Sequence, residues 1–252
     1  MNPVVSFLTA FGEVMILVGR TLREFFRPPF ELDLTLEQLE RGGVDSWSLT
    51  FLTAIFTGMV MASQFAVGLE PFGATPYTGK IVALGFVREL GPVLTSLLVG
   101  GRVGAGMTAE LGSMAVTEQI DAIRALGADP VRKLVLPRVV AMTVAIPLLT
   151  VMADIIGCLG GVLITVTQIG LTATYSIELM VEAISISDVL HGLIKSLFFG
   201  SIIAIVACWN GMSVHGGSVA VGRATTSTVV YTSVTILVAN FLLTQILLKV
   251  YA

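Results

Sequence analysis

Two stretches of this sequence are too long and too apolar to lie on the surface of a water-soluble protein. Ser46 to Leu69 is a run of 24 residues without a charged side chain, and Ala224 to Leu248 is a run of 25. A helix of about 20 apolar residues crosses the hydrocarbon core of a bilayer. Only 12% of the whole chain is charged, against about 25% in soluble domains. We therefore expect a helical membrane protein, and a large soluble core is excluded.

Three further apolar runs predict three more spans. They extend from about Ile81 to Gly101, from the residue after Arg138 to about Gln168, and from about Leu190 to Trp209. The expected fold is therefore an all-α membrane protein with five transmembrane helices. We assign the chain to one domain, 1–252, whose transmembrane core is 44–252.

The first 43 residues differ from this core. The apolar run 4–19 has 16 residues, too few to span, and Arg20 and Arg23 follow it. This pattern predicts an amphipathic helix lying in the cytoplasmic interface of the membrane. A sixth span is the alternative. A short helix, Leu36–Arg41, is expected before the core begins.

One span contains charges. Arg88 and Glu89 fall inside the second apolar run, because Leu90 to Gly101 alone is too short to cross the membrane. A charge at that depth costs at least about 2.5–3.5 kcal/mol, so such residues usually pair or face a polar cavity. Two interpretations remain open: an ion pair that holds helices together, and a polar patch in a substrate path.

Two sets of apolar or small residues raise a similar question. Met61, Phe65, Gly68 and Phe72 recur at helical spacing, so they share one face of the first span. This face either packs against a neighbouring helix or lines a cavity. The pairs Gly100/Gly104 and Gly157/Gly161 allow close helix packing, within one subunit or across a dimer.

The segment between the second and third spans is polar. Met114 to Leu126 has the periodicity of an amphipathic helix, and Gly127 is a typical residue for its C-terminal end. Asp129-Pro130 then predicts an N-cap and the first position of the next helix. This helix lies on the membrane surface or docks to a partner; its residues do not decide between the two.

The distribution of basic residues predicts the orientation. With the N-terminus inside, cytoplasmic segments hold ten of the 14 Lys and Arg residues. Positive charges concentrate on the cytoplasmic side of membrane proteins. The polar segment is therefore expected in the cytoplasm and the C-terminus outside. The ten residues are Arg20, Arg23, Arg27, Arg41, Arg102, Arg124, Arg132, Lys133, Arg138 and Arg223.

Several functions lack the residues they require. Gly79-Lys80 has the wrong spacing for a phosphate loop, and Ile81 replaces the necessary Ser or Thr. His191 and His215 have no nucleophile or carboxylate at suggestive spacing. Cys158 and Cys208 lie in apolar runs, as small buried side chains do. We expect no catalytic residue, metal site or cofactor, and without a basic stripe no nucleic-acid partner.

An ordered set of motifs from about Val44 to the C-terminus resembles the MlaE/YrbE permease family. The two parts of the second span and the polar segment carry most of it, and a further motif precedes the last span. The motifs are Arg88-Glu89-Leu90-Gly91-Pro92, Gly101-Arg102-Val103-Gly104, Ala109-Glu110-Leu111-Gly112-Ser113-Met114, Thr117-Glu118-Gln119-Ile120-Asp121-Ala122, Asp129-Pro130 with Pro137-Arg138, and Arg223-Ala224-Thr225-Thr226.

The resemblance implies a function and partners. It implies the homodimeric membrane subunit of an ABC transporter that moves phospholipids between the inner and outer membranes of Gram-negative bacteria. Partners in the family are a cytoplasmic ATPase, an MCE-domain substrate-binding protein on the periplasmic side and often a STAS-domain protein on the ATPase. The expected location is the inner membrane, with the C-terminus in the periplasm.

The resemblance also implies which residues contact the ATPase and which line the lipid cavity. The polar segment becomes a coupling helix that contacts the ATPase, and the two subunits enclose a lipid cavity. An ion-coupled lipid transporter without an ATPase, using Arg88-Glu89 or Asp154, is the alternative. The implied ATPase contacts are Glu110, Thr117, Glu118, Asp121 and Arg124. The implied cavity residues are Met61, Phe65, Gly68, Leu69, Phe72, Arg88, Glu89 and Leu90.

Overall fold

The protein is a bundle of long helices. The computed structural model describes residues 3–27 and 31–251, and these residues form helices and no strand. Five runs of the described residues are long and apolar enough to cross a membrane: Leu32–Phe72, Thr75–Val116, Val131–Thr167, Ile186–Met212 and Ser218–Lys249. The predicted all-α fold with five spans is therefore confirmed.

The helices follow one another with short connections. The first run contains α2 (Leu32–Gly42), the 3-10 turn Val44–Ser46 and α3 (Trp47–Leu69). The second contains α4 (Thr78–Gly85), α5 (Gly91–Val99) and α6 (Ala105–Val116). The others contain α8 (Leu136–Thr167), α10 (Ile186–Met212) and α11 (Ser218–Tyr251), while α1 (Pro3–Phe25), α7 (Gln119–Ala125) and α9 (Ala173–Ala183) lie outside the five runs.

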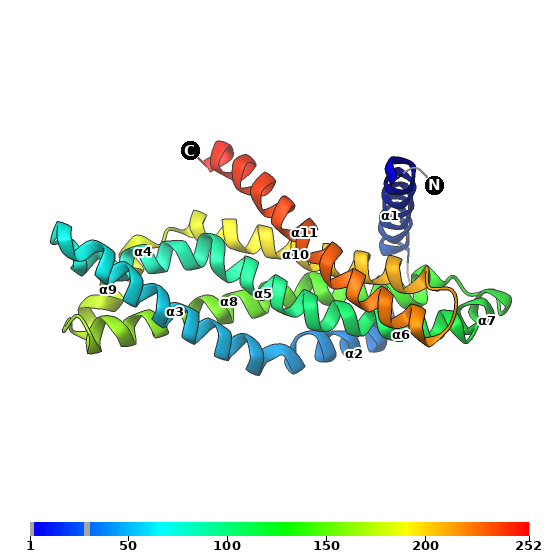
Figure 1. Ribbon diagram of the computed structural model, residues 1–252, viewed down its shortest axis with the longest axis horizontal. Helices are drawn as coiled ribbons and strands as arrows, with labels where there is room; N and C mark the ends of the chain where they lie inside the picture. Colours follow the sequence, from blue (N-terminus) through cyan, green and yellow to red (C-terminus); the bar gives the residue numbers. More distant parts are fainter. Residues whose placement is uncertain (1–2, 28–30, 252) are drawn as a thin grey trace.

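The connecting helices mark the two ends of the bundle (Figure 1). Helices α3, α8 and α10 and the run α4–α6 extend along the long axis of the molecule, while α7 lies at one end and α9 near the other. Below, these are the α7 end and the α9 end. The chain thus crosses the bundle five times, and its polar segment lies at the α7 end.

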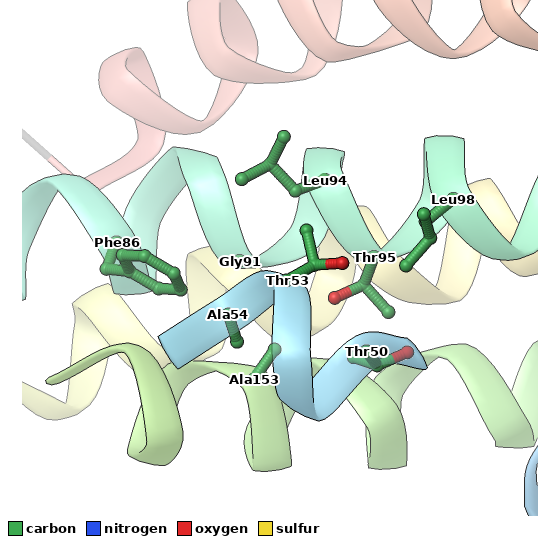
Figure 2. Close-up of a pocket in the computed structure, with 9 residues that line it drawn as sticks. All are labelled: Thr50, Thr53, Ala54, Phe86, Gly91, Leu94, Thr95, Leu98 and Ala153. Atoms are coloured by element: carbon green, nitrogen blue, oxygen red, sulfur yellow. The ribbon is translucent and has the colours of Figure 1, made fainter. Parts of the chain in front are cut away.

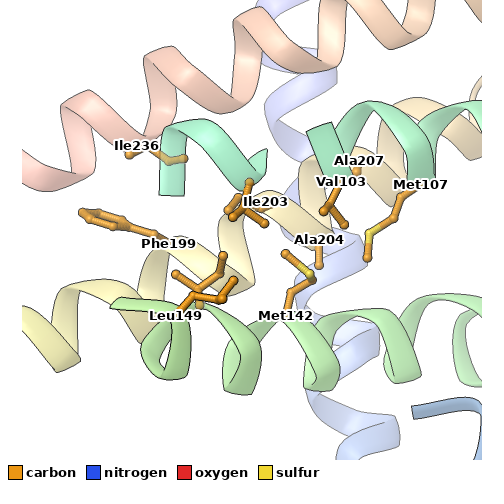
Figure 3. Close-up of a cluster of buried hydrophobic side chains, with 11 residues drawn as sticks. Val103, Met107, Met142, Leu149, Phe199, Ile203, Ala204, Ala207 and Ile236 are labelled. Carbon is orange, nitrogen blue, oxygen red and sulfur yellow. The ribbon is translucent and has the colours of Figure 1, made fainter. Parts of the chain in front are cut away.

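The core forms where the last four runs meet. Val103, Met142, Phe199 and Ile203 are buried there together with Ile236 of α11. Figure 3 shows these side chains pointing into the space between the helices. Within the membrane such packing, and not exclusion of water, holds helices together.

Glycine permits the contact between α3 and α8, which is the most extensive between two helices of the described residues. A Cβ added at Gly58 would meet the backbone of Gly157, and one added at Gly160 would meet the carbonyl oxygen of Ile55. Gly157 and Gly161 face side chains of the same chain, as Gly100 and Gly104 do. The small-residue pairs therefore serve packing within one subunit.

The second run is longer than predicted. Its helix continues past Gly101 to Val116, which adds about 22 Å at 1.5 Å per residue. Two π-helical turns, Phe86–Leu90 and Gly100–Gly104, divide it. Each wider turn accommodates one extra residue without ending the helix. The predicted boundary at Gly101 is wrong because the wide turn and the glycines there continue the helix instead of stopping it.

The N-terminal helix projects from one side of the bundle. Helix α1 is not among the five candidate spans, and Figure 1 shows it near the α7 end, transverse to the long helices. Leu17, Thr21 and Glu24 form its buried face, and the Trp209 indole donates a hydrogen bond of 3.0 Å to Glu13. The next helix, α2, extends from Leu32 to Gly42 and is longer than predicted.

Helix α11 is the least enclosed span. Only 11% of its most apolar stretch is buried, against 50% for that of α10. It packs on α6 and α10 near the α7 end, and its C-terminal part diverges from the bundle (Figure 1). Most of its apolar surface, such as Leu237 and Phe241, is exposed in the single subunit.

Candidate functional site

The charges in the second span lie in the first π-helical turn, and each pairs with α10. The Arg88 guanidinium bonds Asp188, with both Nε and Nη2 2.5 Å from Oδ1. Asp188 is 2% exposed and also closes the capping box that begins α10, where its Oδ2 accepts hydrogen bonds from the Ser185 amide and hydroxyl. One carboxylate therefore both caps a helix and neutralises a cation.

Glu89 is the centre of a second group. The Lys195 ammonium, 1% exposed, lies 2.6 Å from Glu89 Oε1. From α11, Asn240 Nδ2 donates to Oε2 at 3.1 Å and the Thr244 hydroxyl donates to Oε1 at 3.1 Å. One carboxylate thus joins three spans. Below, Arg88, Glu89, Asp188, Lys195, Asn240 and Thr244 are called the charged network.

The network shows which partners the two charges have. Arg88 and Glu89 each form an ion pair with α10, and both remain partly exposed, so these pairs are compatible with a polar path beside them. The sequence did offer Lys195 and Asp188 as possible partners of Arg88 and Glu89, because both are charged residues in or beside a predicted span. Asn240 and Thr244 were missed; their only sequence signal is a polar pair at i, i+4 in an uncharged run.

The predicted cavity residues divide into two groups. Met61 and Leu90 pack with Phe86 in a small core cluster. Phe65 and Phe72 are 36% and 82% exposed, and Gly68 has open space beside it. Within one subunit the face of α3 is therefore packed at Met61 and open toward the α9 end.

The crevice between α3 and α5 is too small to hold a lipid. Figure 2 shows Thr50, Thr95 and Leu98 around it, with Phe86 at one side. Its volume is about 10 Å³, about one water molecule. A larger apolar groove of about 340 Å³ lies between α8 and α9, with Asp154 in its lining. Asp154 Oδ1 is buried without a hydrogen-bond partner among the described residues and lies against Gly91.

The polar segment is divided into two helices. The single helix predicted from Met114 to Leu126 is wrong, because α6 ends at Val116 and α7 begins at Gln119. Glu118, between them, has φ 58°, and it is the single described non-glycine residue with positive φ. That left-handed conformation turns the chain. Gly127 (φ 78°) ends α7, and the Asp129 carboxylate accepts the Val131 amide at 2.9 Å, as predicted for these two positions.

The predicted coupling residues also fall into two groups, those bonded within the bundle and those exposed at its tip. Glu110, on α6, lies 2.9 Å from the buried Arg138 and 3.7 Å from Arg41, so it belongs to the bundle. The Thr117 hydroxyl donates to the Ser113 carbonyl and closes the end of α6. Asp121 and Arg124 form an exposed ion pair of 2.7 Å on α7. Glu118, Asp121 and Arg124 are thus presented at the tip of the bundle.

The remaining candidate groups form no cluster. Among the described residues, no three His, Cys, Asp or Glu side chains are placed to hold a metal ion. Cys158 and Cys208 are free, half-buried and buried respectively.

Known proteins resemble the chain along most of its length. A family model described as "Permease MlaE" matches residues 35–246. A probable ABC transporter permease protein of Rickettsia typhi is 38% identical over 246 residues, covering 98% of this chain and 95% of that protein. The intermembrane phospholipid transport system permease protein MlaE of Haemophilus influenzae is 35% identical over 256 residues, covering 97% and 98%. The Arabidopsis thaliana chloroplastic protein TRIGALACTOSYLDIACYLGLYCEROL 1 is 37% identical over 232 residues, covering 92% and 66%.

Proposed function

Because this chain belongs to the MlaE permease family, we propose that it moves phospholipids between the inner and outer membranes of a bacterium, driven by a separate ATPase. It is a multi-pass membrane permease subunit. Its place is the inner membrane, with the α7 end in the cytoplasm and the C-terminus in the periplasm. The named function of the Haemophilus influenzae relative supports the choice of phospholipid.

One observation carries the mechanical part of this proposal. A single helical run, Thr75–Val116, contains Arg88 and Glu89 and ends at the turn that presents α7. Its two π-helical turns lie between the α9 end and the tip. A push on α7 therefore reaches the charged network through one continuous element. We assign α7 as the coupling helix, contacted by the ATPase at Glu118, Asp121 and Arg124, with Thr117 and Glu110 supporting it from α6.

Charge reversal on α7 tests this assignment. Glu118→Arg and Asp121→Arg should abolish ATP-driven lipid transfer and weaken ATPase association, because the contact would then meet the wrong charge. Both side chains are exposed and outside the core, so folding and dimer formation should persist. Co-purification with the ATPase and transfer between liposomes are the measurements. Unchanged association and turnover in both variants would refute the coupling role.

The lipid cavity is proposed to lie between two copies of the chain. Phe65, Gly68 and Phe72 are exposed in one subunit, and so is most of α11. Two subunits facing each other through these surfaces would enclose apolar walls for the acyl tails. Leu69, Met61 and Leu90 complete those walls, while Arg88, 44% exposed, and Glu89, 39% exposed, would meet the headgroup.

Photocrosslinking tests the cavity. A photoreactive residue at Leu69 or at Leu90 should capture phospholipid in the purified dimer. The same residue at Leu159, half exposed on α8, is the control for lipid at the protein surface. Capture only at Leu159 would place the lipid path elsewhere.

The remaining partners are tested by co-purification. An MCE-domain protein should bind at the α9 end, and a STAS-domain protein should co-purify through the ATPase.

An ion-coupled transporter is the second candidate. The buried and unpartnered Oδ1 of Asp154 favours it, since an uncompensated intramembrane carboxyl is a typical proton site. Lipid transfer by the purified subunit in liposomes, with a proton gradient and no ATPase, would support it. Loss of that transfer in Asp154→Asn would assign the proton site.

A further inference from the structure

A pocket at the α7 end lies apart from the lipid cavity proposed above, although Glu110, which supports α7 in that proposal, is among its lining residues. It lies between α2, the 3-10 turn before α3 and the second run, and has a volume of about 460 Å³. Helix α3 has 23 residues, about 35 Å, close to the thickness of the hydrocarbon core. Its first residue, Trp47, therefore lies at a membrane boundary. Because the pocket includes Asp45, two residues before Trp47, it lies at the level of the lipid headgroups.

Two opposite charges line this pocket without pairing. Arg102 Nη1 donates to the main-chain oxygen of Asp45 at 2.6 Å and to Ser46 Oγ at 3.0 Å, both neutral groups. No carboxylate of the described residues lies within 4.0 Å of it. The Asp45 carboxylate, likewise, is in no ion pair of the described residues. The lining of the pocket therefore includes a cation and an anion that are in no ion pair of the described residues.

The other charges of the pocket are compensated. Arg41 lies 2.6 Å from Glu37 and 3.7 Å from Glu110, whose second oxygen lies 2.9 Å from Arg138. A purely anionic ligand would therefore bind one free cation, Arg102, against the repulsion of Asp45. A ligand with a positive and a negative group satisfies both free charges.

The walls fit a lipid as well. Gly106 lines the pocket, and a Cβ added there would meet no atom within 4 Å, so the pocket is open at this point. Leu49, Leu52 and Phe56 recur at intervals of three and four in α3, which begins two residues after Asp45, so they share one face of that helix. They are 39%, 52% and 59% exposed. An exposed apolar strip thus runs along α3, the helix that begins beside the pocket.

We propose that this pocket binds the headgroup of a phosphatidylethanolamine molecule. The phosphate accepts hydrogen bonds from Arg102, the ammonium donates to Asp45, and one acyl chain lies along Leu49 and Leu52. Arginine is suited to phosphate, and charge-assisted bonds of this kind are the strong ones. The site is separate from the transport cavity, which lies toward the α9 end of α3.

Lipid binding to the purified full chain, without ATP or partners, tests the proposal. Native mass spectrometry would compare phosphatidylethanolamine with phosphatidylglycerol. We expect the first to bind several-fold more tightly, and Asp45→Asn and Arg102→Gln each to weaken it about tenfold, the loss of one charge-assisted bond. Gly106→Leu should weaken binding similarly by filling the pocket. Arg223→Gln, at another exposed arginine, is the matched control and should bind as the unaltered chain does.

Each other outcome would overturn the assignment. Equal binding of the two lipids, or no change in Asp45→Asn, removes the zwitterionic site. Tighter binding of phosphatidylglycerol, strengthened by Asp45→Asn, indicates an anionic lipid instead. Displacement by glycerophosphoethanolamine at equal concentration indicates a soluble phosphodiester. If Arg102→Gln fails to fold, Asp45→Asn decides alone, because no described residue bonds that carboxylate. Failure of lipid transport would leave this binding result unchanged.

Discussion

Charged side chains gather in two regions of this molecule, the charged network inside the bundle and the tip at α7, and their bonding differs. In the network every ion pair joins two helices: Arg88 to Asp188 and Glu89 to Lys195, across about a hundred residues of sequence. At the tip, Asp121 and Arg124 pair within one turn of the same helix and are 68% and 61% exposed.

The difference follows from the surroundings. In the hydrocarbon core a charge without a partner is costly, so pairing between helices decides which helices lie together. In water a charge is solvated whether or not it is paired, and an exposed pair contributes little. The same residue types therefore organise the bundle in one region and remain available for a partner in the other.

Removing one network charge should have the largest effect. Lys195→Met leaves Glu89 without its cation, and we expect a loss of about 3 kcal/mol, the lower end for breaking a buried pair because Glu89 is partly exposed. Unfolding of the purified protein in mixed micelles measures it. The double variant Glu89→Gln/Lys195→Met should recover most of the stability. A double variant as unstable as the single one would show that packing of Lys195, and not charge, holds the network.

A smaller effect is expected from the link to α11. Asn240→Leu removes the hydrogen bond to Glu89 Oε2, and such bonds between membrane helices average about 0.6 kcal/mol, with a maximum near 1.7. The same unfolding assay measures it, with Gln245→Leu on the exposed side of α11 as the control. A loss as large as that of Lys195→Met would make the amide, and not the ion pair, the main attachment of α11.

The smallest effect should come from the tip. Asp121→Asn with Arg124→Gln removes the exposed pair, and we expect a change in stability below about 0.5 kcal/mol. ATPase association should nevertheless weaken, because these side chains are proposed to contact it. A stability loss of several kcal/mol would erase the distinction between the two regions, since the pair would then be structural.

Much of the fold could be predicted from the sequence, because hydrophobic length is a local property. The run Ser46–Leu69 becomes α3 almost residue for residue. The breaks were harder to predict. Glu118 adopts a left-handed conformation without glycine or proline beside it, so nothing in the local sequence separates α6 from α7.

The site residues were predictable only in part. Arg88 and Glu89 were evident as charges in an apolar run, because the cost of burying a charge applies wherever the helix lies. Their partners in ion pairs, Asp188 and Lys195, could not be assigned, because they are distant in sequence. Asn240 and Thr244 are ordinary residues of an apolar run until Glu89 is placed beside them.

The sequence by itself determined which segments of this protein lie in a membrane. Apolar length and sparse charge place five helices in it and one polar segment outside it. The tertiary structure decided which charge meets which, that the second run continues through two π-helical turns to the tip, and that Arg102 and Asp45 remain unpaired beside an open pocket. The reason is physical. Transfer of a helix into lipid depends on its own residues, whereas pairing in a low dielectric depends on which helices pack together.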